Sequence, residues 1–278
     1  MATMLPFIEN PYFKCYNKPK KDYSERKMKE FNVEKFKIRL MDKTNKEEVE
    51  KVQRLRYLYL LKDYNPSLPA EGVDADGYDD VSDSILVIDT EKDVIAGTYR
   101  VATNDTINGH KFLTEDEYDI HELIESGERF LELGRAVVHV DYRNGFVIQL
   151  LLLAIYHYAT EHNCKYYIGL CSFHGVDPSI YDHGFSFLAR DYSFKKYNIT
   201  ACNNAFDLHF IDDDKIDILK AKEQLPSLLR MYLRLGHRVC VGGSIDYNFN
   251  SCDVLIILDS DAINIKYFNR MMKINTKD

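Results

Sequence analysis

Hydrophobic and polar residues alternate with two different periods along the chain, and the changes of period predict the order of the elements. Alternation at residues 35–40 predicts a first strand. Apolar residues at helical spacing from Lys46 to Lys62 predict an amphipathic helix. Two apolar runs at 84–89 and 94–101, joined by a short charged turn, predict an antiparallel hairpin.

The middle of the chain has the pattern of a strand, a helix and a second strand. After a short helix suggested at 114–126, residues 130–140 predict a strand, 144–163 a helix and 165–171 another strand. Two strands joined in this way are expected to lie parallel in one sheet. The sequence therefore predicts an α/β fold with a mixed, mostly antiparallel central sheet flanked by helices.

The domain organisation follows from composition along the chain. Residues 1–34 include a stretch dense in Lys, Arg and Tyr, which predicts an N-terminal arm. No internal repeat or long linker interrupts the remainder, so 35–278 is expected to form one domain. Within it we expect a core of about 35–212 and a C-terminal elaboration at 213–278.

Composition narrows the class of protein. The chain has 278 residues, of which 45% are hydrophobic and 29% charged, as in ordinary globular proteins. A formal net charge of −8 argues against general nucleic-acid binding. The six cysteines form no CxxC pair, and the first ten residues do not resemble a signal peptide. These features predict a cytoplasmic protein, and leave open a peripheral contact with the inner membrane.

Two charged residues interrupt the apolar strand predicted at 130–140. Glu132 and Arg135 are three positions apart, which places them on opposite faces of a regular strand unless a bulge brings them together. Buried charges are costly without a partner. The pair is therefore either a structural ion pair or a set of groups that meet a substrate.

Two further segments carry candidate chemistry. Arg143, Asn144 and Gly145 open the helix after this strand, and a basic side chain beside helix-start amides can hold a phosphate. Asp74, Asp76 and Asp79 lie in an acidic loop that lacks the bidentate Glu of a calcium loop. No metal site is expected there, and the loop is either a solvated surface or a site that attracts a cationic amine.

Taken in order, these motifs resemble one family. Arg56-Tyr57, the three aspartates of the acidic loop, GTYR ending at Arg100 and ELGRAVVHVDYRNG from Glu132 resemble the ornithine N-acyltransferases and the related N-acyl amino acid synthases of the GNAT superfamily. A more distant resemblance is to the acyl-homoserine lactone synthases. The similarity extends over roughly residues 40–270, and implies a GNAT-like fold.

The resemblance implies direct transfer of a long-chain fatty acyl group from a thioester to the α-amine of an amino acid, with ornithine as the leading acceptor. No tightly bound cofactor is expected. A coenzyme A loop of this superfamily has two closely spaced small residues, and Val147 stands at the second position. This favours the phosphopantetheine of an acyl carrier protein, bound by Arg143, Asn144 and Gly145, over coenzyme A.

The resemblance also implies roles for the charged residues. Glu132 is the expected base, and Arg135 orients it or holds substrate. A backbone amide at a bulge near 137–140 is the expected oxyanion donor. Arg100 is the candidate for the acceptor's carboxylate, whereas Asp76 and Asp79 hold its ammonium or organise the loop. The expected acceptor-binding residues are thus Arg56, Asp76, Asp79 and Arg100.

Other functions stay open. Leu60, Lys62 and Ser84 differ from the family's usual residues, which leaves room for glycine, lysine or tyrosine as acceptor, or for a homoserine-lactone-type signal synthase. A protein that binds an acyl carrier without turnover is a different class. A thioester hydrolase is a third. Separately, Cys171 or Ser172 beside His174 is either a nucleophile activated by the histidine or part of the packing and turn at the end of the strand.

Overall fold

The computed structural model describes residues 28–273 of the chain. A ten-stranded sheet has the strand order β1-β2-β3-β4-β6-β7-β12-β11-β9, with β10 beside β12. Every strand pair in it is antiparallel except β6 with β7, which confirms the predicted mixed, mostly antiparallel sheet. Its strands are β1 (Phe31–Val33), β2 (Phe36–Leu40), β3 (Asp83–Asp89), β4 (Val94–Thr103), β6 (Phe130–Val138), β7 (Tyr166–His174), β9 (Ala205–Phe206), β10 (Arg238–Val239), β11 (Gly243–Asp246) and β12 (Ser251–Asp259).

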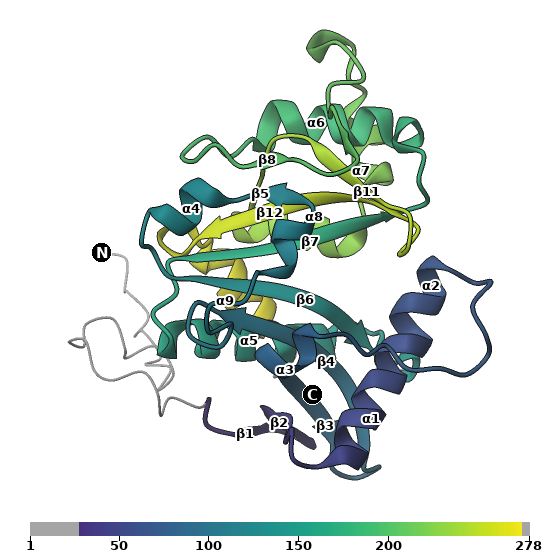
Figure 1. The fold of residues 1–278 in the computed structure, drawn as a ribbon, viewed down its shortest axis with the longest axis vertical. Coiled ribbons are helices and arrows are strands. Elements are labelled where there is room, and N and C mark those ends of the chain that lie inside the picture. The colour runs from purple at the N-terminus through teal and green to yellow at the C-terminus, as the bar shows by residue number, and fades with distance from the viewer. Residues whose placement is uncertain (1–27, 274–278) are drawn as a thin grey trace, which may run out of the picture.

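Helices cover both faces of this sheet (Figure 1). The predicted crossover is confirmed, because α5 (Phe146–Glu161) joins the parallel strands β6 and β7 and packs on one face of β3, β4 and β6. The opposite face carries α1 (Lys46–Arg56), which contacts β4 and β6. No helix formed by residues 28–273 is both long enough and apolar enough to span a bilayer.

The helix predicted from Lys46 to Lys62 changes its geometry part-way. The first part, α1, begins at Asn45, whose side chain accepts the backbone N–H of Glu48. The chain then widens into a π-helical turn at Tyr57–Leu61 and ends in the short α2 (Lys62–Tyr64). Such turns often occur at functional sites. Here the turn places residues 59–64 beside the diverging ends of β6 and β7.

Several segments differ from the sequence prediction. The segment expected to be a short helix at 114–126 consists of a 3₁₀ turn (Leu113–Asp116), a strand β5 (Tyr118–Asp119) and α4 (His121–Glu125). β5 pairs with β8 (Thr200–Ala201) in a separate two-stranded sheet. The remaining helices are α3 (Tyr78–Val81), α6 (Asp182–Tyr192), α7 (Ile218–Gln224), α8 (Ser227–Leu235) and α9 (Ile265–Lys273).

The N-terminal arm predicted at 1–34 overlaps the first strand of the sheet. Residues 31–33, at the end of that segment, form β1 and pair with β2. Residues 1–27 lie outside the described part of the chain.

The parallel strands β6 and β7 are paired over only a short length, and beyond it a gap opens between them. Hydrogen bonding runs only from the Phe130–Tyr166 pair to the Leu133–Gly169 pair, after which the two strands diverge. On its other side β6 carries a bulge, because the register with β4 shifts between Gly134 and Val137. Arg135 within this bulge has a φ of 52°. The bulge therefore lies directly before Val137, next to the position near 137–140 at which it was expected.

The close approach of β7 to β6 depends on Gly169. A Cβ at this position would lie 2.7 Å from the carbonyl oxygen of Leu133, so β7 would have to move away. We expect Gly169→Ala to lower the free energy of unfolding by about 1–3 kcal/mol, measured by urea denaturation. The control is Gly134→Ala on the facing strand, where a Cβ meets no atom within 4 Å. An equal loss in both variants would contradict this explanation.

Candidate active site

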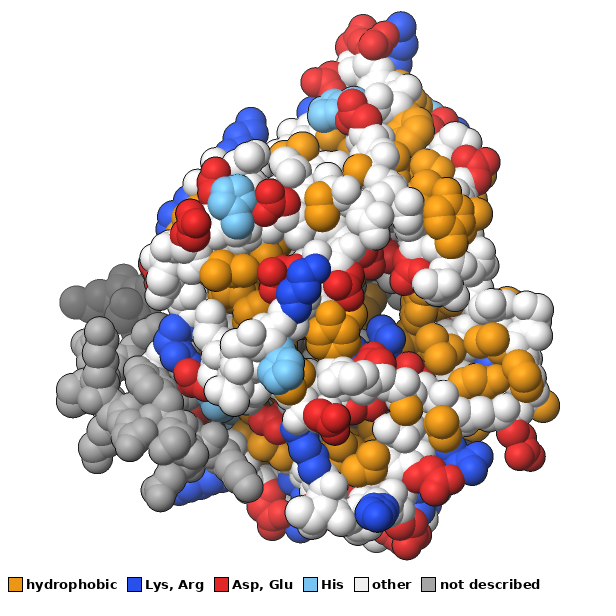
Figure 2. All heavy atoms as spheres, in the orientation of Figure 1, with side chains coloured by type: hydrophobic (Ala, Val, Ile, Leu, Met, Phe, Trp, Pro, Cys, Tyr) orange, Lys and Arg blue, Asp and Glu red, His pale blue; other side chains and the backbone are white. Residues whose placement is uncertain are grey.

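Two connected cavities occupy the gap between the diverging strands. The inner cavity, of about 250 Å³, is lined by residues 132–136 of β6 and 170–172 of β7. An outer groove of about 720 Å³ continues from it past α2 and the start of α8. Figure 2 shows the molecule hollowed between the α1–α2 arm and the upper part of the sheet, with acidic and hydrophobic side chains at its edge. The residues that line both cavities are Leu60, Tyr64, Ala136, Ser172, Pro226 and Leu228.

Arg56 holds the acidic loop against the sheet. It lies at the end of α1 and is only 1% exposed. Its guanidinium donates to both carboxylate oxygens of Asp79, at 2.7 and 2.8 Å, and its Nε lies 3.1 Å from Asp74. Burial opposes the charge, but these hydrogen bonds and charges raise the pKa of Arg56 overall. Burial would raise the pKa of Asp79, but the Arg56 guanidinium outweighs this effect and lowers the pKa to about 2.

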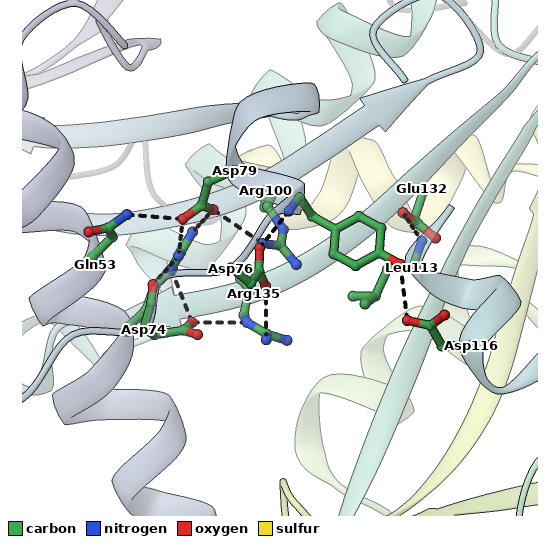
Figure 3. A network of polar contacts seen from close by, with 11 residues as sticks. Gln53, Asp74, Asp76, Asp79, Arg100, Leu113, Asp116, Glu132 and Arg135 are labelled. Atoms are coloured by element: carbon green, nitrogen blue, oxygen red, sulfur yellow. Dashed lines mark hydrogen bonds and ion pairs between the residues drawn. The ribbon is translucent and has the colours of Figure 1, made fainter. Parts of the chain in front are cut away.

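Arg100 and Arg135 complete this network (Figure 3). Arg100 donates to Asp76 at 2.6 Å and to Asp79 at 3.2 Å. Arg135 donates to Asp74 at 2.9 Å and to Asp76 at 3.3 Å. Three carboxylates thus meet three guanidinium groups, and the charges balance. The geometry fits the loop-organising role of Asp76 and Asp79, while their contact with a substrate ammonium stays a prediction.

Glu132 stands apart from this network (Figure 3). Its side chain is 7% exposed and accepts the backbone N–H groups of Leu113 at 3.2 Å and Thr114 at 2.7 Å. The bulge therefore does not pair Glu132 with Arg135, since Arg135 turns toward the acidic loop instead. Burial raises the pKa of Glu132 despite these hydrogen bonds. A cavity-lining carboxylate with a raised pKa is suited to accept a proton.

Two of the three predicted phosphate-binding residues line the groove, and Asn144 lies between them in the chain without lining it. Arg143 and Gly145 are part of its lining. Gly145 precedes α5 with a φ of 95°, which favours glycine, and Asn144 accepts the backbone N–H of Phe146 at 3.0 Å. The guanidinium of Arg143 is held by the carbonyl of Tyr59 at 3.1 Å and the carboxylate of Asp63 at 3.0 Å. Arg143 is thus pre-positioned at the groove, and Asn144 serves to begin the helix.

Three acidic residues of the inner cavity were not predicted from the sequence. Glu117, Asp246 and Asp253 line it together with Glu132. One carboxylate oxygen from each of these three lies within 4.8 Å of the others. They are far apart in the sequence, so no local motif links them. Asp253 nevertheless offered a signal, because it is the one charged residue in the apolar run 252–258, as Glu132 is on its own strand.

The Cys171 environment argues against a thiol nucleophile. Burial raises the pKa of the Cys171 thiol to about 12, so it carries no thiolate near neutral pH. Alternation along β7 also places the Cys171 and His174 side chains on opposite faces of the strand. A cysteine protease-like pair is therefore not formed.

The sequence of this chain is similar to that of proteins whose activity is known. An acetyltransferase (GNAT) domain model matches residues 55–153. The L-ornithine N(alpha)-acyltransferase of Agrobacterium fabrum is 31% identical over 239 residues, covering 81% of this chain and 82% of the relative. The chain belongs to the L-ornithine N(alpha)-acyltransferase family. It is therefore an N-acyltransferase with a GNAT domain, and the family resemblance found in the sequence is confirmed.

A second ornithine acyltransferase, from Brucella abortus, is 32% identical and covers 70% of this chain and 73% of its own. Similar solved structures include the N-acyl amino acid synthase FeeM from uncultured soil microbes, at 11% identity and a TM-score of 0.49, over 83% of this chain and 98% of that one. The acyl-homoserine lactone synthase LasI has 12% identity and a TM-score of 0.44, over 80% and 89%.

Some residues of the site of this ornithine acyltransferase family member lie inside the segment that matches the GNAT domain, and others lie outside it. The matched segment spans the Asp–Arg network, Glu132 and the Arg143 loop. Asp246 and Asp253 lie beyond it, in the C-terminal part of the chain. The acidic end of the inner cavity is therefore built partly by residues outside the matched domain.

Proposed function

We propose that this enzyme transfers a long-chain fatty acyl group from the thioester of an acyl carrier protein to the α-amine of ornithine, giving an N-acyl amino acid of the lyso-ornithine-lipid kind. The observation that carries this proposal is the continuity of the acidic inner cavity with the outer groove across the β6–β7 gap. An amine in the inner cavity and a thioester arm in the groove would meet at Ala136 and Ser172, which line both. The named function of the relatives supports ornithine as the acceptor.

The chemistry requires a base and close positioning. Glu132 accepts a proton from the α-ammonium, directly or through one water, and the freed nitrogen lone pair attacks the thioester carbonyl carbon. The new C–N bond gives a tetrahedral oxyanion, whose collapse breaks the C–S bond, and the sulfur leaves with the bonding electron pair. The second proton of the nitrogen passes to this thiolate, so that an amide and a free thiol are formed. Arg135 and Ala136 lie in the bulge and line the inner cavity, so their backbone N–H groups are the candidates for the oxyanion donor. No acyl-enzyme intermediate is needed.

The acceptor's carboxylate is best placed at Arg135. This residue lines the inner cavity, whereas Arg100 does not and is almost completely buried beneath the acidic loop. Arg135 also lies over the ring of Phe249, 5.7 Å from its centre, which fixes the guanidinium at the cavity wall. In this assignment Arg56, Asp76, Asp79 and Arg100 hold the loop that positions Arg135.

The donor side rests on Arg143 at the groove. Arg143→Ala is expected to raise the KM for the acyl carrier thioester about tenfold, because a charge-assisted hydrogen bond to the phosphate is lost. Asp63→Asn serves as the opposite test, since it releases Arg143 from its present partner and should leave KM unchanged or lower it. Steady-state kinetics at saturating amine measures both. A KM that is the same in wild type and Arg143→Ala would remove Arg143 from the phosphate contact.

The function itself is tested with purified protein, acyl carrier thioesters, acyl-coenzyme A and a panel of amino acids. Thiol release that requires ornithine, together with an N-acylated product by mass spectrometry, supports the proposal. A preference for coenzyme A thioesters would contradict the carrier-protein donor. Thiol release without any amine indicates a hydrolase, and no release with any donor indicates a binding protein.

A further inference from the structure

We propose that Glu117, Asp246 and Asp253 form a binding site for the side-chain ammonium of a diamino acid acceptor, and so select such acids over neutral ones. This inference rests on the proposed function, and assigns the substrate group that the acidic end of the cavity recognises. The α-amine of the same molecule would face Glu132, and its carboxylate would face Arg135.

The three carboxylates converge from separate elements. Glu117 follows the 3₁₀ turn, Asp246 ends β11 and Asp253 lies near the start of β12. Their nearest oxygens lie within 4.8 Å of one another. A cation at their centre would lie within about 2.8 Å of an oxygen from each, which is the N–H···O distance of a hydrogen bond. An ammonium has three N–H donors, one for each carboxylate.

Asp253 has an oxygen that nothing in the described protein satisfies. The residue is 3% exposed, its Oδ2 accepts the hydroxyl of Ser251 at 2.9 Å, and the nearby Ser172 side chain also stabilises the ionised carboxylate. No hydrogen bond from residues 28–273 reaches its Oδ1, and the same holds for the buried Oε2 of Glu117. Both residues line the cavity. A buried acceptor without a donor is costly, so this end of the cavity is prepared for a donor from outside the chain.

The charge of this cluster is also unmatched. Within residues 28–273, no Lys, Arg or His forms an ion pair with Glu117, Asp246 or Asp253. Arg135 is the cation that acts on Asp253, and it is already bonded to Asp74 and Asp76. Burial raises the pKa of Glu117 to about 8, and the charge of Asp253 adds to this shift. Burial also raises the pKa of Asp253 to about 6, against the opposing hydrogen bonds of Ser172 and Ser251 and with a smaller contribution from Asp246. An ammonium bound among these groups would favour their ionised forms. This contrasts with the acidic loop, in which Asp74, Asp76 and Asp79 are each paired with arginine.

The position of the cluster favours an acceptor over a free ion. It shares one cavity of about 250 Å³ with Glu132 and Arg135, which suits a molecule of amino-acid size that carries two amines and a carboxylate. A site built from buried polar groups rejects an analogue that leaves them unpaired, by up to about 10⁴-fold. Norvaline has the carbon skeleton of ornithine without the side-chain amine, and is therefore the informative comparison.

The test compares ornithine with norvaline in wild type and in Asp253→Asn. We expect kcat/KM for ornithine to fall about a hundredfold in the variant, mainly through KM, because one partner of a buried charge contact is lost. Activity with norvaline should stay within about threefold or rise. The control Asp214→Asn removes an exposed acid in the 3₁₀ turn at 213–215 and should change neither substrate.

A binding readout separates this inference from the proposed function. Ornithine, but not norvaline, should raise the thermal unfolding temperature of wild type, and this shift should disappear in Asp253→Asn. If wild type acylates norvaline as well as ornithine, the inference is overturned and the proposed function stands. If no amine is acylated but the ornithine shift is present, the proposed function fails and the ammonium site stands. If Mg²⁺ or Ca²⁺ alone gives the shift, and chelation abolishes activity, the cluster is a metal site and the inference is overturned.

Discussion

Replacing Glu132 with Gln is expected to lower kcat for acyl transfer at least a hundredfold, the usual contribution of a positioned general base. The amide keeps the shape of the side chain but cannot take the amine proton. It also places an NH₂ group against one of the two backbone N–H donors of Leu113 and Thr114, so a small loss of stability, about 1 kcal/mol, is expected as well. Thermal unfolding alongside single-turnover kinetics separates the two effects.

The matched control is Glu125→Gln, an exposed acid at the end of α4, for which wild-type kinetics are expected. The pH profile supplies a second check. Glu132 must be ionised to act as a base, and burial raises its pKa, so kcat/KM should fall on the acidic side at a pH above the ordinary range of a glutamate. Near-normal turnover in Glu132→Gln would remove this residue as the base.

Much of the fold was predictable because it depends on local patterns. The β3–β4 hairpin and the β6–α5–β7 crossover each extend over one continuous segment, so the hydrophobic period was sufficient to locate them. The π-helical turn at Tyr57–Leu61 was not predictable, since its residues YLYLL are apolar in every direction. The position of the bulge at Arg135 depends on the register with β4, which sequence spacing does not contain.

In the site, too, local motifs were predictable and contacts between distant elements were not. Glu132, Arg135 and the acidic loop were found because they form motifs along the chain. The pairing of Arg56 with Asp79 across the loop, and the convergence of Glu117 with Asp246 and Asp253, arise only when distant elements pack together. A charge inside an apolar strand is the sequence signal that Glu132 and Asp253 share. A charged residue inside an apolar strand is therefore a candidate site residue whether or not a motif surrounds it.

The largest expected effect on stability comes from Arg56. Arg56→Met would leave the buried carboxylate of Asp74 and the partly buried carboxylate of Asp79 without the guanidinium that contacts both. Removing one partner of a buried ion pair costs about 3–5 kcal/mol, which corresponds to a lowering of the unfolding temperature by about 10 °C. Arg54→Met is the control on the same helix, because its pair with Glu50 at 2.7 Å is exposed and contributes less than about 1 kcal/mol.

The pH dependence of the difference in stability between wild type and Arg56→Met shows whether charge or packing causes that difference. The pKa of Asp79 is about 2 in the folded protein, below the usual value of an aspartate, so its pairing with Arg56 stabilises the fold above that usual value. This contribution is lost as the pH falls toward 2, and the gap between wild type and Arg56→Met should narrow from about pH 4 downward. A gap that stays constant over this range would show that Arg56 stabilises the protein by packing rather than by charge. An unfolding temperature of Arg56→Met within about 2 °C of wild type would contradict the role of this network altogether.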